Sequence, residues 1–191
     1  MEKQINRGQD GAGLANIKFD MKPGERYISR YRSIDSKPVQ DIFSHITNRF
    51  EEIASIDPAL LKDVNYLKQN AGFTGELFLG HLRYGTFGRN SIENCHPFLR
   101  QNNWITRNLV VAGNFNLTNV DELFDVLLEL GQHPKEKSDT VTVLEKIGHF
   151  LDNENQQLFD DLKGKGLTNQ EITLKIAEKL RDLLEEESIQ I

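Results

Sequence analysis

Four side chains are the best suited to chemistry: the guanidinium of Arg83, the carboxamide of Asn114, the carboxylate of Asp139 and the thiol of Cys95. An arginine presents a flat, two-toothed donor to a carboxylate, an asparagine N–H can stabilise a developing oxyanion, and a cysteine thiolate is a nucleophile. Each residue also has a plainer interpretation. Arg83 can be an ion-pair partner, Asn114 a turn residue, Asp139 a helix N-cap and Cys95 a small buried hydrophobe.

The histidines do not predict a metal centre. His81 lies in an apolar stretch and is expected to be a hydrogen-bonded core histidine rather than a base. The other four show no metal-ligand spacing: His45, His96, His133 and His149. The chain also has no phosphate-loop or dinucleotide-binding fingerprint, so we expect neither a metal nor a cofactor in this chain.

Four strand-like segments and two glycine-rich segments surround these residues. RGQDGAG (7–13) is a glycine-rich turn, and AGLANIKF (12–19) predicts a strand. A Pro-Gly turn at 21–26 leads into RYISRYR, which predicts the returning strand of a hairpin. ELFLGHLRY (76–84) and RNLVVAG (107–113) have little polar interruption, so each predicts a strand buried on both faces. The stretch 85–98 between them predicts a loop.

Helical spacing of apolar residues predicts the remaining elements. One helix begins at Pro38 and continues to about Ile53, and a second begins near Asp57 and Pro58. A third follows a cap at Thr118 or Asn119 and stops at Gly131. A fourth is capped by Ser138 or Asp139, and a fifth covers 169–187.

Composition excludes several classes of protein. The 191 residues suffice for one domain with a hydrophobic core, and 38% hydrophobic with 27% charged residues is ordinary for a soluble protein. A net charge of -6 without a basic patch argues against nucleic acid or an anionic membrane as a partner. No apolar run approaches the roughly 20 residues that span a bilayer. With no signal-like start and a single cysteine, we expect a cytoplasmic protein.

Four segments, in order, resemble the glutaminase domain of class II glutamine amidotransferases of the amidophosphoribosyltransferase type. They are RGQDGAG (7–13), GHLRYGTFGRNSIENCHPF (80–98), AGNFNLTN (112–119) and SDTVTVLEKI (138–147). Any one of them is weak, but the four together with plausible spacings are specific. Residues 45–74 and 152–191 lie outside the resemblance.

The resemblance implies glutamine hydrolysis. In that family an N-terminal cysteine attacks the glutamine side-chain amide, ammonia leaves, and water hydrolyses the thioester. Ammonia then passes to a phosphoribosyl acceptor domain to form phosphoribosylamine in purine biosynthesis. By position, Asn114 and the backbone N–H of Phe115 would hold the oxyanion, Arg83 the α-carboxylate of glutamine, and Asp139 its α-ammonium group. The other pocket residues implied by the resemblance are Tyr84, Thr86, Arg7 and Gly8.

The chain departs from the family in ways that affect activity. Residue 2 is Glu2 where the family has the nucleophile, and Cys95 is mid-chain without a free amine. Phe115 stands where relatives usually have glycine. We therefore expect residues 1–191 to be a single truncated domain, lacking the first strand and the later phosphoribosyl domain, and inactive for lack of the nucleophile.

The fold implied by the resemblance is α+β, the four-layer αββα sandwich of N-terminal-nucleophile hydrolases, here incomplete. Loss of a strand would leave an unpaired edge, so self-association into a homo-oligomer is an expectation. Two alternatives stay open. One is a non-catalytic glutamine-binding module, and the other is a glutaminase domain serving another acceptor, such as a sugar phosphate.

Overall fold

The structure, a computed structural model, describes residues 1–85 and 91–188, apart from the side chains of residues 2, 5, 7 and 180–188. It separates into two compact units. The first consists of Met1–Phe98 and Val110–Phe115, and the second of Leu99–Leu109 and Asn116–Ile191. Helices and antiparallel sheets occur together, in agreement with the predicted α+β class.

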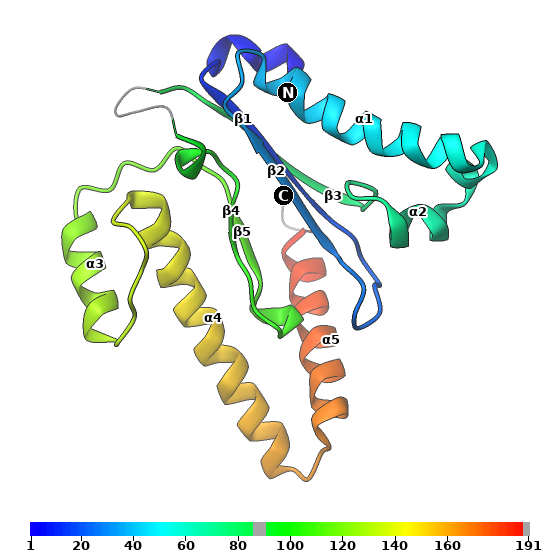
Figure 1. Cartoon of the computed structure of the whole chain (residues 1–191). Helices are drawn as coiled ribbons and strands as arrows, with labels where there is room; N and C mark the ends of the chain where they lie inside the picture. The colour runs from blue at the N-terminus through cyan, green and yellow to red at the C-terminus, as the bar shows by residue number, and fades with distance from the viewer. Residues whose placement is uncertain (86–90, 189–191) are drawn as a thin grey trace. The chain divides into compact units, whose positions relative to one another are not determined.

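A three-stranded antiparallel sheet forms the centre of the first unit (Figure 1). It contains β1 (Gly11–Ile17), β2 (Ile28–Ser33) and β3 (Leu77–Arg83), in the order β2-β1-β3. Leu14 pairs with Tyr31 on one side and with Gly80 on the other. The predicted hairpin over the Pro-Gly turn is thereby confirmed.

Helix α1 (Pro38–Ile56) covers one face of this sheet and makes its core (Figure 1). The buried cluster is Ala12, Leu14, Val39 and Ile42, with Met1, Tyr31, Ile46, Phe73 and Leu82 packed against it. Each fully buried valine or isoleucine contributes roughly 1.5–3 kcal/mol relative to an exposed one. Proline at the first helical position confirms the predicted start of this helix.

Two predictions in the first unit were wrong. β3 is not buried on both faces, because it is an edge strand, and Leu77 and Phe78 are 50% and 51% exposed. Such an apolar edge can promote association, and the expected homo-oligomer stays a prediction. The segment 7–13 is not simply a turn, since a short 3₁₀ helix (Glu2–Arg7) precedes it and Gly11 and Gly13 lie within β1.

The segments between β2 and β5 are short. The predicted second helix is a 3₁₀ turn (Pro58–Lys62) followed by α2 (Val64–Asn70). Residues 91–97 contain a 3₁₀ turn (Ile92–Asn94), in keeping with the predicted loop, while 86–90 lie outside the described residues. β4 (Phe98–Arg100) and β5 (Leu109–Val111) form a two-stranded sheet with another 3₁₀ turn (Ile105–Arg107) between them. The strand predicted at 107–113 is therefore shorter than expected and only half-buried.

Three helices build most of the second unit. They are α3 (Val120–Glu129), α4 (Asp139–Gly164) and α5 (Asn169–Ser188), and α4 packs against both others (Figure 1). The Ser138 hydroxyl accepts a hydrogen bond from the Val141 N–H at 3.3 Å and caps α4, as predicted. Asn119, one of the two predicted positions, is the N-cap residue of α3, but its side chain makes no capping hydrogen bond. Gly131, at φ +79°, follows α3 as expected.

A half-buried arginine is held against α4 by two carboxylates. Arg100 Nε lies 3.1 Å from Glu145 Oε2, and its Nη2 lies 2.6 Å from Asp152 Oδ2. Gly148, one turn from each carboxylate, provides the space. A Cβ atom at that position would lie 2.5 Å from Arg100 Cδ and 2.8 Å from Cζ. The absence of a side chain at Gly148 is therefore a packing requirement.

We predict that Gly148→Ala destabilises the second unit, whereas Gly164→Ala in the same helix does not. The new methyl group displaces the Arg100 side chain, at a cost of about 1–3 kcal/mol that outweighs the helix-propensity gain of about 1 kcal/mol. Gly164 has nothing within 4 Å of the added atom, so its variant keeps that gain. Urea unfolding followed by fluorescence of Trp104, the single tryptophan, reports on this unit. Equal stability of the two variants would contradict the packing requirement.

Candidate functional site

Arg83, at the end of β3, is a buried cation without a carboxylate partner among the described residues. It is 9% exposed, and its Nη1 donates to the Ser91 carbonyl at 3.4 Å. None of the ion pairs between described side chains includes it. The plainer expectation, a structural ion pair, is not observed in that part of the chain. A buried guanidinium that lacks an anion is suited to receive one from a ligand.

Glycines in β1 let another segment lie directly on the sheet beside Arg83. Gly11 pairs with Arg83 and Gly13 with His81. A Cβ atom at Gly11 would be 2.6 Å from Cys95 Sγ, and one at Gly13 would overlap the His96 carbonyl oxygen. The face opposite α1 is therefore covered by the segment from Cys95 to Pro97.

Two arginines of β2 hold that covering segment. Arg32 Nη1 donates to the Cys95 carbonyl at 2.9 Å, and Arg30 Nη1 donates to the Pro97 carbonyl at 3.3 Å. Arg30, Arg32 and Arg83 all project from the same face of the sheet, because residues two apart on a strand share a face and the registers align them. This face is strongly cationic.

Two imidazole rings pack against each other within this site, tilted by 33°. The rings of His81 and His96 lie 4.5 Å apart, centroid to centroid. The Gly113 N–H donates to His96 Nδ1 at 3.4 Å, while the buried His81 Nδ1 has no hydrogen-bond partner among the described atoms. At this atom His81 lacks the hydrogen bond expected of a core histidine. Burial, then the positive charges of His81, Arg83 and Arg32, lower the pKa of His96 to about 4.

Cys95 behaves as a buried structural residue. It is 0% exposed, and its Sγ lies 3.8 Å from the Ser33 carbonyl oxygen. Burial raises the pKa of its thiol, although Arg83 and Arg32 act in the opposite direction. A neutral, enclosed thiol is a poor nucleophile, as the sequence indicated.

The predicted oxyanion donors lie at the end of the strand that follows. Asn114 is exposed, and the Phe115 ring packs over Gly113, where a Cβ atom would be 2.7 Å from Phe115 Cζ. Among the described non-glycine residues, Asp20 and Phe73 have positive φ, and Phe115 does not. Phe115 therefore adopts this backbone without the strain that a left-handed conformation imposes on a non-glycine residue.

The remaining predicted residues are divided between the units. Gly8 packs so closely on β3 that its Cβ would be 2.7 Å from the Leu82 carbonyl carbon. Tyr84 is 67% exposed, the Arg7 side chain is not described, and Thr86 lies outside the described residues. Asp139 belongs to the second unit, where its Oδ2 accepts a hydrogen bond from the Leu117 N–H at 2.8 Å. Its pairing with Arg83 around a ligand stays a prediction.

Asp10 is a site residue that the sequence analysis missed. Its Oδ2 accepts a hydrogen bond from the Gly85 N–H at 2.7 Å, and its own N–H donates to the Arg83 carbonyl at 3.2 Å. It thus ties the RGQD segment to the chain immediately after Arg83. The acidic residue at the end of that motif was the available signal.

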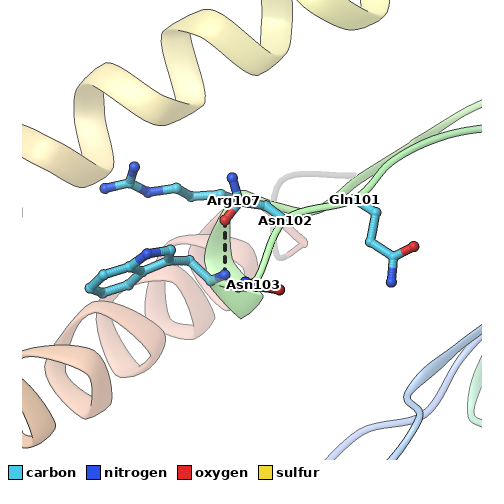
Figure 2. Close-up of a pocket in the computed structure, with 5 residues that line it drawn as sticks. Gln101, Asn102, Asn103 and Arg107 are labelled. Atoms are coloured by element: carbon cyan, nitrogen blue, oxygen red, sulfur yellow. Dashed lines mark hydrogen bonds between the residues drawn. The ribbon is translucent and has the colours of Figure 1, made fainter.

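The hollows of the surface do not coincide with these residues. In the second unit, Gln101, Asn102, Asn103, Trp104 and Arg107 line a hollow of about 490 Å³. Figure 2 shows Arg107 extending away from Gln101, and the dashed line is the Trp104 N–H donating to Asn102 Oδ1 at 2.9 Å. The Arg107 guanidinium instead donates from Nη2 to Gln156 Oε1 at 3.2 Å, so these polar groups do not converge on one point. We therefore give more weight to the buried cation and the close glycine contacts than to this hollow.

Neither a metal centre nor a membrane span is found in the part of the chain that the structure describes. Its histidines, cysteine and acidic residues form no group of three or more suited to a metal ion. No described helix combines the length and apolar character needed to cross a bilayer.

Comparison with known proteins identifies amidotransferases as relatives. The chain is 30% identical over 118 residues to the amidophosphoribosyltransferase of Methanocaldococcus jannaschii, covering 62% of this chain and 18% of the relative. It is 27% identical over 144 residues to the glutamine–fructose-6-phosphate aminotransferase of Sulfurisphaera tokodaii, covering 73% and 23%. The chain is similar to class II glutamine amidotransferases. It spans about a fifth of the length of these curated relatives.

A third relative is the amidophosphoribosyltransferase of Archaeoglobus fulgidus, 34% identical over 77 residues, which are 40% of this chain and 16% of the relative. No family model matches the chain. No solved structure matches it either. The similarity agrees with the resemblance carried by the four sequence segments.

We predict that acid weakens the first unit through His96. Its folded pKa of about 4 lies below the ordinary 6.5, so the unfolded chain binds the proton more tightly. The contribution of neutral His96 to the free energy of unfolding is therefore fully present above pH 6.5. It is lost as the pH decreases toward 4, by on the order of 2–3 kcal/mol. Burial lowers the pKa of His81 as well, which acts in the same direction.

The measurement is hydrogen exchange of β1 and β3 amides between pH 7 and 4, corrected for intrinsic exchange. His96→Gln keeps a hydrogen-bond acceptor and should flatten the pH dependence, whereas the exposed His133 in the second unit provides the control variant His133→Gln. An unchanged slope in His96→Gln would contradict this assignment.

Proposed function

We propose that this chain is a glutamine amidotransferase-like domain that binds the amino-acid head of glutamine through Arg83. The observation that carries the proposal is a buried guanidinium without a carboxylate partner among the described residues. It lies where three of the four resembling segments meet. Asp10 and Gly11, His81 and Cys95–His96, and Gly113 are joined there by hydrogen bonds and glycine contacts.

Recognition would follow the charges of a zwitterion. The planar guanidinium of Arg83 would bind the α-carboxylate with two parallel hydrogen bonds, and the Asp139 carboxylate would bind the α-ammonium group. The Asp139 Oδ2 atom already accepts the Leu117 N–H, which restricts the rotation of this carboxylate and leaves Oδ1 for a ligand.

The amide end of glutamine would meet the strand end after β5. The Asn114 side-chain N–H and the Phe115 backbone N–H would stabilise the oxygen of the tetrahedral intermediate. Asn114 is exposed and has no packing role that a ligand would disturb. Tyr84, Thr86, Arg7 and Gly8 would complete the wall of this pocket.

The nucleophile is not supplied by the cysteine of this chain. Hydrolysis requires a thiolate that attacks the carboxamide carbon, a proton for the departing ammonia, and water to cleave the thioester. The Cys95 thiol is enclosed and its pKa is raised. We propose that these residues bind glutamine without turning it over, within a fold of the four-layer αββα sandwich type.

The acceptor is proposed to be a phosphoribosyl group in purine biosynthesis. The chain is 30% identical to the amidophosphoribosyltransferase of M. jannaschii and 27% identical to the aminotransferase of S. tokodaii. A sugar-phosphate acceptor is the second candidate. The observation that favours it is coverage, because the aminotransferase relatives extend over 73% of this chain.

We predict that Arg83→Met weakens binding of L-glutamine by tenfold or more, because a two-toothed charged interaction is lost. Titration followed by calorimetry or NMR measures the dissociation constant. Arg26→Met is the matched control, since it removes another arginine of the first unit that takes no part in holding the Cys95–Pro97 segment. It should change the constant by less than about threefold. Folded Arg83→Met that binds glutamine like the parent chain would refute the role of Arg83.

We also predict that a glutamine-analogue electrophile does not label the folded chain. Cys95 is 0% exposed, so the reagent has no access to a thiolate. Intact-mass spectrometry detects the adduct, and iodoacetamide labelling in urea confirms that the thiol is free. Stoichiometric, glutamine-protected labelling of native Cys95 would overturn this assignment and support a catalytic role for it.

A further inference from the structure

A cavity of about 480 Å³ lies in the first unit, on the side of the sheet that α1 covers. It is bounded by the end of the β1–β2 hairpin, by α1, and by the segment that follows α2. Many of its residues belong to the stretch 45–74, which lies outside the resemblance to amidotransferases. Its principal lining residues are Lys18, Arg26, Ser29, His45, Arg49 and Gln69.

The lining is cationic in a chain whose net charge is -6. Lys18, Arg26, Arg30 and Arg49 contribute positive charge, and Arg30 Nη1 also donates to the Pro97 carbonyl. Glu52 is the acidic residue in the described lining, and its Oε2 is already paired with Arg49 Nη1 at 2.8 Å. The surplus of positive charge is therefore not matched by carboxylates of the cavity itself.

Lys18 is the central group, because it is a buried ammonium held only by neutral oxygens. It is 5% exposed, and its Nζ donates to the carbonyls of Ala71, at 2.6 Å, and Lys68. An ammonium group has three N–H donors, so one stays available to a ligand. Burial, followed by the charges of Arg26 and Lys68, lowers the pKa of Lys18, while Glu25 opposes them.

The wall opposite the sheet is preformed. Arg49 donates to the Asn70 carbonyl from Nε at 3.3 Å and from Nη2 at 2.9 Å. Gly72 lies against Ser29, where an added Cβ would be 3.2 Å from the hydroxyl, and Phe73 has φ 60°. These contacts fix the turn after α2 that carries the Lys18 acceptors, so a ligand would meet an ordered site.

We propose that this cavity binds a small organic molecule through a phosphate group. Its volume lies within the roughly 300–1,000 Å³ of small-molecule sites. A phosphate accepts hydrogen bonds in several directions, which suits a lysine point charge beside the Arg26 guanidinium. Arg83 is not among the residues that line this cavity, so this site is distinct from the proposed glutamine site.

The test is NMR titration of the full chain with inorganic phosphate and with pyrophosphate, at constant ionic strength. We expect saturable shifts in residues 69–73 and in the α1 turn containing His45 and Arg49. Sodium acetate at the same concentration should produce much weaker binding. Equal binding of acetate, or shifts that do not saturate, would overturn the phosphate site.

Charge reversal provides the matched variants. Arg26→Glu should weaken phosphate binding by tenfold or more. Lys22→Glu alters the charge equally in the same hairpin but lies outside the lining, and it should change binding by less than threefold. Arg26→Gln, which avoids a new negative charge, should also bind more weakly than the parent chain. Similar constants for the Arg26 and Lys22 variants would reject the proposal, as would competition between phosphate and L-glutamine for one site.

Discussion

The His96 backbone lies on β1 so closely that a side chain at Gly13 would overlap its carbonyl oxygen. This close approach is what allows Arg32 to donate to the Cys95 carbonyl and the His96 ring to pack against the His81 ring. It also encloses the Arg83 guanidinium. A larger residue at Gly11 or Gly13 would displace the segment after Arg83, and the cationic face would open to water. The candidate site therefore depends on the two glycines, Gly11 and Gly13, as much as on the charged residues.

Positive charge is arranged on both faces of one small sheet, although the chain as a whole is acidic. On one face Arg30 and Arg32 bind carbonyls of the covering segment, while Arg83 keeps capacity for an anion. On the other, Lys18 binds carbonyls of the turn after α2. Burial of cations against carbonyls rather than carboxylates leaves a positive potential inside the unit. That potential is the common basis for proposing an amino-acid carboxylate at one face and a phosphate at the other.

Three of the four segments that resemble amidotransferases in sequence are also in contact with one another in the first unit. The similarity to each relative covers only part of this chain. The chain in turn covers about a fifth of the M. jannaschii amidophosphoribosyltransferase and of the S. tokodaii aminotransferase. Within the first unit, the segments that carry the likeness are the ones joined by Asp10, the β1 glycines and His96. Residues 45–74, outside the four resembling segments, include most of α1, all of α2 and much of the lining of the second cavity.

Sequence alone determined the local elements, because their causes are local. Proline set the start of α1, the Pro-Gly pair set the β1–β2 turn, and Ser138 capped α4. It also indicated Arg83, Asn114 and Asp139 through the resemblance, and the structure shows Arg83 buried beside Cys95 and His96. Tertiary structure alone decided that β3 is an exposed edge, that His81 meets His96, and that Lys18 faces a cavity. These features join residues far apart in the chain, and their burial depends on which strand lies beside which, information that no local pattern of residues contains.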